Sequence, residues 1–197
     1  MDKISKKNKM IKKRIKALIS KFSKYNIDGY VIPKNDEFFS EYSQNDRLKT
    51  ISNFSGSAGY SIILKKKNFL FVDGRYTIQA EKEAGNSFKI INYQKIVNCD
   101  LFKNLTLGFD PKIFTSEQIK KFFKKHNNVK IIEQNLVDQI SKKKRISGKP
   151  FFSLEDKIVG EDYKKKILKI KKFLNKNNSN YIFISAPENV AWLLNIR

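Results

Sequence analysis

Short apolar runs alternate with segments of helical spacing along the first 140 residues of the chain. Two runs, Tyr60–Leu64 and Phe69–Val72, are separated only by a polar turn, which predicts an antiparallel β-hairpin with largely buried strands. Further strands are expected at residues 30–32, 88–91, 105–109 and 129–132, and helices at residues 10–24, 37–41, 79–83 and 117–126. This alternation predicts one α/β domain from about Met10 to Ile140, a mixed β-sheet of about five or six strands flanked by helices.

The first helix is strongly basic on one side. Its apolar positions fall at helical spacing with lysines between them, at Ile11, Ile15, Leu18, Ile19 and Phe22. Such a helix could rest on a membrane surface or act as a mitochondrial presequence. The acidic Asp2 and the excess of Lys over Arg argue against a presequence, and the interrupted apolar positions argue against a secretory signal. We therefore expect a helix packed on the sheet with a solvated lysine face.

A loop rich in small residues precedes the hairpin, and a charged turn follows it. Six of the eight residues from Ser52 to Gly59 are Ser, Gly or Ala, which permits a tight turn and close approach to another surface. After the second strand, the turn Asp73-Gly74-Arg75 could place a guanidinium beside this loop. From chemistry alone, the loop could equally be an ordinary turn, and Arg75 could simply pair with Asp73 or a backbone carbonyl and fix the hairpin.

These two segments also carry a family resemblance. Residues 51–59 (ISNFSGSAG) and 71–80 (FVDGRYTIQA) resemble the N-terminal domain of Xaa-Pro aminopeptidases of the creatinase/prolidase group, which usually read SGFTGSAG and TDGRYFLQA. The chain departs from this pattern at Asn53, where the family has Gly, and at Val72, where it has Thr. Further matching segments are residues 28–33, 40–42, 108–111 and 135–140. The resemblance implies a creatinase N-terminal domain-like fold.

The chain then starts again after a basic segment. Residues 141–150 read as an exposed linker, and they are followed by an amphipathic helix at residues 163–175, a strand at residues 181–185 and Pro187. Helix, turn, strand and proline recur in the order seen at the N-terminus, and residues 190–197 (VAWLLNIR) resemble the family's second domain. We therefore expect a first domain at residues 1–140, a linker at 141–160 and the start of a second, similar domain at 161–197, with the catalytic domain absent. Because this second domain is incomplete, Trp192 should be under-buried.

Charge and cysteine content refine this picture. The formal net charge is +22, which suggests an anionic partner such as nucleic acid, yet only five of the 41 basic residues are Arg. Nucleic-acid binding is therefore not expected, and the lysine excess fits AT-biased coding equally well. No apolar run is long enough to cross a membrane. The single Cys99 excludes an internal disulfide and favours a cytoplasmic location.

No self-contained active site is expected in this chain. The resemblance implies an enzyme that uses two metal ions, commonly manganese, held by a C-terminal domain, and it implies peptide substrates with proline at the second position. In this chain the only histidine, His126, lies among lysines and asparagines, and the carboxylates are scattered. No catalytic residue, metal ligand or cofactor is therefore assigned here.

Two functions stay open on the sequence. The first is the N-terminal, non-catalytic part of an Xaa-Pro aminopeptidase, whose partners would be the missing catalytic domain and a second copy in a homodimer. The residues expected to face a substrate cleft or partner are Phe54, Ser55, Gly56 and Arg75. The second is a stand-alone lysine-rich binding module for anionic partners.

Overall fold

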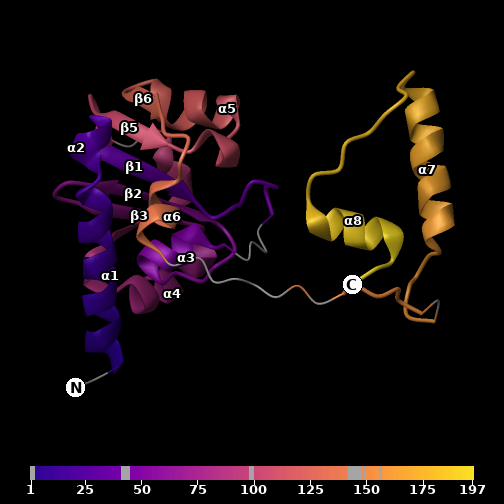
Figure 1. Cartoon of the computed structure of the whole chain (residues 1–197), viewed down its shortest axis with the longest axis horizontal. Coiled ribbons are helices and arrows are strands. Elements are labelled where there is room, and N and C mark those ends of the chain that lie inside the picture. The colour runs from indigo at the N-terminus through magenta and orange to yellow at the C-terminus, as the bar shows by residue number, and fades with distance from the viewer. Residues whose placement is uncertain (1–2, 41–44, 98–99, 142–147, 149, 156) are drawn as a thin grey trace. The chain divides into compact units, whose positions relative to one another are not determined.

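The computed structural model describes residues 3–40, 45–97, 100–141, 148, 150–155 and 157–197 (Figure 1). The chain divides into two compact units. The first comprises residues 1–37 and 41–143, and the second comprises residues 38–40 and 144–197. Cys99 lies outside the described residues. The two units are treated separately below.

A single mixed sheet organises the first unit (Figure 1). Its strands, in the order β4-β3-β2-β1-β5-β6, are β1 (Gly29–Pro33), β2 (Gly59–Leu64), β3 (Asn68–Val72), β4 (Lys89–Asn92), β5 (Thr106–Phe109) and β6 (Asn128–Ile131). The pairs β1–β2 and β2–β3 are antiparallel, whereas β3–β4, β1–β5 and β5–β6 are parallel. This confirms both the predicted hairpin, in which Tyr60 pairs with Phe71, and the mixed sheet.

Helices and single helical turns connect these strands. The α-helices of the first unit are α1 (Lys3–Ile19), α2 (Phe22–Tyr25), α3 (Arg47–Ser52), α4 (Thr77–Ala84), α5 (Ser116–Ile119) and α6 (Leu136–Ile140). The 3₁₀ turns are η1 (Gly74–Tyr76), η2 (Gly85–Ser87), η3 (Tyr93–Ile96), η4 (Asp100–Phe102) and η5 (Pro111–Ile113), and η6 (Lys120–Lys124) is a π-helix.

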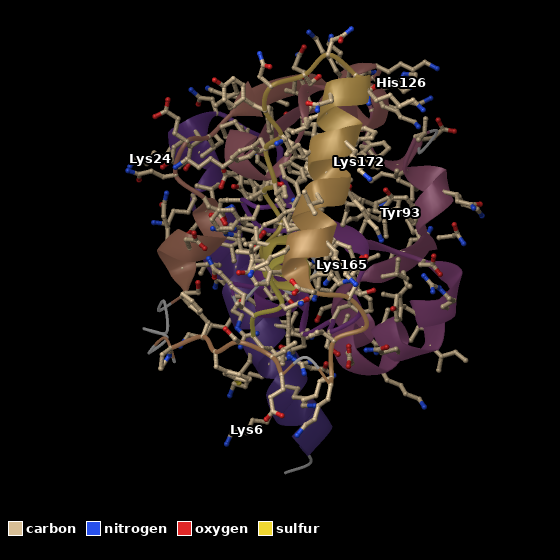
Figure 2. All side chains as sticks on the ribbon, turned by 90° about the vertical axis from the view of Figure 1, so that its right-hand side faces the viewer. Lys6, Lys24, Tyr93, His126, Lys165 and Lys172 are labelled. Atoms are coloured by element: carbon tan, nitrogen blue, oxygen red, sulfur yellow. The ribbon has the colours of Figure 1, made fainter. Side chains whose placement is uncertain are left out.

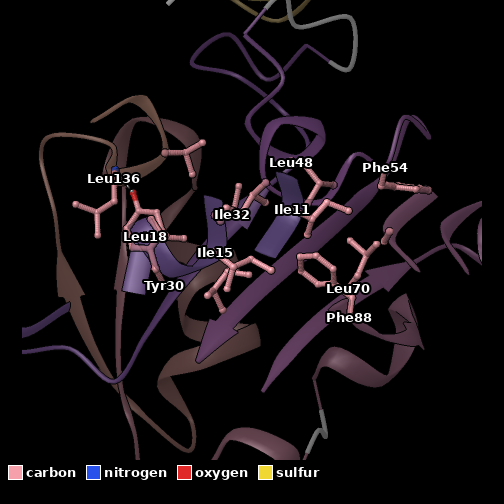
Figure 3. Close-up of a cluster of buried hydrophobic side chains, with 14 of the residues drawn as sticks. Ile11, Ile15, Leu18, Tyr30, Ile32, Leu48, Phe54, Leu70, Phe88 and Leu136 are labelled. Carbon is pink, nitrogen blue, oxygen red and sulfur yellow. Dashed lines mark hydrogen bonds between the residues drawn. The ribbon is translucent and has the colours of Figure 1, made fainter. Parts of the chain in front are cut away.

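Both faces of the sheet are covered, because successive residues of a strand point to opposite faces. Within β1, Tyr30 and Ile32 join a cluster with α1, α3, α4 and α6, whereas Val31 joins a cluster with η3–η6 and α5. Figure 3 shows the first cluster, with Ile11, Ile15 and Leu18 of α1 directed into the core beside Tyr30 and Leu70. The central strands β1, β2 and β3 are therefore mostly apolar and largely buried on both faces, as their sequences indicated.

The basic helix packs on the sheet, and its predicted bounds need correction. Its apolar positions Ile11, Ile15 and Leu18 are buried, which confirms the core-packed interpretation. The helix begins earlier than predicted and ends at Ile19, and a turn separates it from α2. Asn26 then takes a left-handed conformation with φ of 48°, which ends the second helix and turns the chain toward β1.

Two other predicted helices differ from the structure. The helix predicted at residues 37–41 is not formed: residues 37–38 are a turn and residues 39–40 have no regular structure, while residue 41 lies outside the described residues. The Asn35 side chain, which could have capped such a helix, donates to the Ile113 carbonyl at 2.9 Å. The helix predicted at residues 117–126 is α-helical only over Ser116–Ile119 and continues as the π-helix η6. Its start was predicted correctly, since Thr115 and Gln118 form a capping box.

The second unit contains α7 (Tyr163–Lys176) and α8 (Pro187–Leu194). They are joined through Lys166, whose ammonium donates to the Trp192 carbonyl and to Asn195 Oδ1, both at 2.6 Å, and lies 4.1 Å from the indole centre. The strand predicted at residues 181–185 is not formed: these residues have no regular secondary structure and pair with no strand in the described part of this unit. Trp192 is 66% exposed, in line with the exposure predicted for it.

Candidate functional site

The small-residue loop begins where α3 ends. The Asp46 side chain accepts from the Lys49 amide and caps the helix, and Asn53 ends it with φ of 63°. Glycine is favoured in this left-handed conformation, and asparagine is among the other residues that tolerate it best. The Asn53 side chain also accepts a hydrogen bond from Arg14 of α1 at 2.9 Å. Asn53 therefore fits the conformation that the start of the loop requires.

Phe54 anchors the loop in the core, and the glycines let the chain fold around it. The Phe54 side chain is fully buried and meets the Tyr76 ring edge to face, with centroids 5.9 Å apart. A Cβ atom on Gly56 would collide with the Phe54 ring. A Cβ atom on Gly59 would come within 2.8 Å of the Phe71 carbonyl oxygen. These two small residues therefore serve close packing within the domain.

Ser55 and Ser57 attach the loop to the segment after the hairpin. The Ser55 amide and hydroxyl donate to the two carboxylate oxygens of Glu83 in α4, each at 2.7 Å. Burial raises the pKa of Glu83, but the hydrogen bonds from Ser55 and Gln79 outweigh it, so the net pKa is lowered. The Ser57 hydroxyl lies 2.9 Å from the Tyr76 hydroxyl. The loop is therefore attached to α4 through Ser55 and to η1 through Ser57.

Arg75 lies on the surface and pairs within its own turn. Its Nε donates to Asp73 Oδ1 at 3.0 Å, its guanidinium lies 5.7 Å from the centre of the Tyr76 ring, and its side chain is 77% exposed. Asp73 also accepts from the Arg75 amide and so caps η1, and both hydrogen bonds hold the pKa of Asp73 below its usual value. Among the described contacts, Tyr76 rather than Arg75 reaches the loop. Arg75 therefore forms the ion pair with Asp73 that the sequence allowed, and its guanidinium is also exposed to solvent.

A buried charge cluster was not anticipated from the sequence. Arg47 opens α3 and is almost completely buried, yet it donates to Asp138 at 2.9 and 2.8 Å and to Glu37 at 2.6 Å. Burial alone would lower the pKa of Arg47, but the two carboxylates outweigh it and raise the pKa further, so the guanidinium is charged. The signal was present: one of only five arginines precedes the loop, and Asp138 lies in the matched segment 135–140. The cluster fixes α3, and hence the loop, against α6.

The described residues do not form a metal centre. Among them, no group of three or more His, Cys, Asp or Glu side chains is placed to hold an ion. His126, which is labelled in Figure 2, lies in the turn after η6, where its carbonyl accepts from the Asn104 amide. No helix in the described part of the chain is long and apolar enough to cross a membrane.

Comparison with known proteins places this geometry among peptidase domains. The family described as the creatinase/prolidase N-terminal domain matches in two forms, one at residues 14–140 and the other at residues 141–197. A probable Xaa-Pro aminopeptidase P from Coprinopsis cinerea is 31% identical over 201 residues, covering 94% of this chain and 32% of that protein. Xaa-Pro aminopeptidase 1 from Dictyostelium discoideum is 30% identical over 210 residues, covering 95% of this chain and 34% of that protein.

Solved structures agree with the sequence matches. The chain superposes on the X-prolyl aminopeptidase from Caenorhabditis elegans, a cytosolic enzyme with a di-nuclear active site, with a TM-score of 0.78 and 27% identity. That match covers 95% of this chain and 34% of the enzyme. The N-terminal domain of the cytoplasmic peptidase PepQ from Mycobacterium tuberculosis shares the fold, with a TM-score of 0.50 and 17% identity over 66% of this chain and 98% of that one. The chain spans about a third of the length of the curated relatives it matches.

Proposed function

Because the chain belongs to the creatinase/prolidase N-terminal domain family, we propose that it is the N-terminal, non-catalytic part of a metal-dependent Xaa-Pro aminopeptidase. When complete, this enzyme would hydrolyse the bond between an N-terminal residue and a following proline. The observation that carries the proposal is the match to the Caenorhabditis elegans X-prolyl aminopeptidase over 95% of the chain at a TM-score of 0.78. A sequence match of similar extent to relatives from two other organisms supports it.

The catalytic metal ions belong elsewhere in this proposal. The Caenorhabditis elegans enzyme has a di-nuclear active site, but no group of described residues in this chain fits one ion, let alone two. The ions, for which we propose manganese, would be held by a separate catalytic domain, and they would activate the attacking water there. The isolated chain should therefore be inactive.

The contribution of this chain would be to shape access to the catalytic cleft. The first domain, residues 1–140, would present the loop at Phe54, Ser55 and Gly56, with Phe54 as its buried support. The exposed guanidinium of Arg75 would contact a substrate or a neighbouring subunit. Residues 141–160 would link it to a second, similar domain that begins at residue 161. We further propose a homodimer and a cytoplasmic location.

A chimaera tests this function directly. The corresponding N-terminal third of the Caenorhabditis elegans enzyme is replaced by this chain, and release of the first residue from an Xaa-Pro-containing peptide is measured with manganese present. The chimaera should cleave the peptide, whereas the isolated chain should release no amino acid above background. Cleavage by the isolated chain that a chelator abolishes would show that this chain holds its own metal site and would contradict the proposal.

A further inference from the structure

A lysine-rimmed groove in the first unit lies outside the loop described above. It has a volume of about 740 Å³ and is bounded by α1, the β2–β3 turn, η2 with the start of β4, and Leu101. This volume is in the range of pockets that hold ligands of several hundred daltons. None of the contacts that tie the loop at Phe54–Gly59 to α4 involves a residue of this groove.

The rim of the groove is cationic on more than one side. Six lysines line it, namely Lys12, Lys16, Lys65, Lys66, Lys67 and Lys89, and no Asp or Glu is among the described residues that line it. Lys12 and Lys16 stand one turn apart on α1, and three consecutive lysines occupy the β2–β3 turn. Among the described residues, only Lys65 of this rim has a carboxylate partner, Asp28, at 3.3 Å. The groove thus concentrates positive charge from separate elements.

The floor of the groove is apolar. Ile15, Phe69 and Phe88 are buried beneath it, and Leu101 is 41% exposed at its edge. Two oxygens of groove residues, Asn68 Oδ1 and Ser87 Oγ, are buried without a hydrogen-bond partner in the described part of the chain. These two atoms have almost no exposed surface, so a ligand in the groove would not contact them. The rim and the floor together therefore favour a ligand that combines negative charge with apolar groups.

We propose that this groove binds an extended acidic peptide that also carries apolar side chains. Successive side chains of an extended peptide point to opposite sides, so carboxylates can reach the rim lysines while apolar groups face the floor. A single phosphate or carboxylate headgroup would neutralise only the nearest of six charges spread over three elements. A single-stranded nucleic acid fits less well, because no exposed aromatic ring is among the described residues that line the groove, whereas Leu101 and the half-buried Ile19 can contact aliphatic side chains.

The test uses the full chain and a fluorescein-labelled peptide of alternating glutamate and leucine, followed by fluorescence anisotropy at low ionic strength. The variant Lys12→Glu/Lys16→Glu/Lys66→Glu should weaken binding at least about tenfold. The matched variant Lys112→Glu/Lys121→Glu/Lys125→Glu makes the same change in net charge at exposed lysines outside the groove and should change binding less than about twofold. Leu101→Ser should weaken binding of this peptide more than binding of an all-glutamate peptide.

Several results would overturn the proposal. Equal weakening by the two triple variants would show attraction to the overall charge of the chain rather than a site. A second such result would be that oligothymidylate displaces the labelled peptide as effectively as unlabelled peptide does, and that its binding is weakened equally by the groove substitutions. That result would show that the groove binds polyanions in general rather than an acidic peptide. Far-UV circular dichroism confirms that each variant is folded. Lys66→Glu, in the exposed turn, gives the same comparison against Lys121→Glu if a triple variant does not fold.

Discussion

Arg47 and Asp138 lie 91 residues apart in the sequence and form a two-point hydrogen-bonded ion pair, Nε to Oδ1 at 2.9 Å and Nη2 to Oδ2 at 2.8 Å. The pair joins the first residue of α3 to the middle of α6 on one face of the sheet. Because Arg47 is almost fully buried, its charge depends on this partner and on Glu37.

The first prediction concerns this pair. Replacing Asp138 by Ala should lower the free energy of unfolding of the first unit by about 3 kcal/mol, because it leaves a buried guanidinium with one carboxylate instead of two. The comparison change Arg75→Ala, which removes the exposed ion pair but keeps the Asp73 cap of η1, should have a much smaller effect. Urea unfolding should be followed by far-UV circular dichroism, since the only tryptophan lies in the second unit. Equal effects of the two substitutions would contradict the structural role of Arg47.

The second prediction concerns acid stability. The folded-state pKa of Glu83 is below its ordinary value of 4.5 because Ser55 and Gln79 bind the carboxylate. Its contribution to stability is therefore present above that ordinary value and is lost as the pH falls through the folded-state pKa.

Glu83→Gln should accordingly destabilise the domain most near about pH 7 and progressively less toward about pH 3. Ser55→Ala should shift stability in the same direction by a smaller amount, because the Ser55 amide still donates to Glu83. Urea unfolding at a series of pH values measures both. A destabilisation by Glu83→Gln that is constant over this range would exclude the lowered pKa.

The strands of the sheet could be predicted well because each one is specified by a short, continuous segment of the sequence. The short apolar runs, such as Tyr30–Ile32, and the polar turn at residues 65–68 specify strands and a hairpin without knowledge of the rest of the chain. The helix start expected at residue 117 was likewise nearly correct, since α5 begins at Ser116 after the Thr115 cap.

The features that could not be predicted depend on contacts that are distant in sequence. Glu37 and Asn35 resembled a helix start, but their side chains bind Arg47 and the Ile113 carbonyl instead. The π-helical turn of η6 arises in tertiary packing and has no simple composition signal. Of the loop residues, the sequence indicated the small side chains correctly. It did not reveal that Phe54 is buried or that Tyr76 is the residue that reaches the loop.

The third prediction tests the conformation of the loop entrance. Asn53→Ala should destabilise the first unit by about 1–2 kcal/mol, because alanine is strained at a φ of 63° and also loses the hydrogen bond from Arg14. Asn53→Gly removes the same hydrogen bond without the strain and should cost less. Comparing the free energies of unfolding of the two variants, measured by chemical denaturation, separates the cost of backbone strain from the cost of the lost side-chain hydrogen bond. A larger loss for glycine than for alanine would show that the conformation is not left-handed.

The fourth prediction concerns the second unit. Trp192 is 66% exposed, so its emission should resemble that of free indole and should be quenched readily by acrylamide. In the chimaera described above, where the second domain is complete, the emission of Trp192 should shift to the blue relative to that of the isolated chain. A blue-shifted, quencher-resistant signal in the dilute isolated chain would show that the apolar surface is already covered.

The outermost strands of the sheet have a consequence for assembly. β4 and β6 are four residues long, and each carries a lysine, Lys89 and Lys130, on an exposed position. Short edge strands that carry charges resist pairing with the edge strand of another copy. Pairing two such strands would bring lysines of the two copies close together and would form only a few backbone hydrogen bonds. Continuous intermolecular sheets, and the fibres that grow from them, are thus disfavoured for the first unit. A homodimer would have to form through side-chain surfaces rather than through a shared sheet.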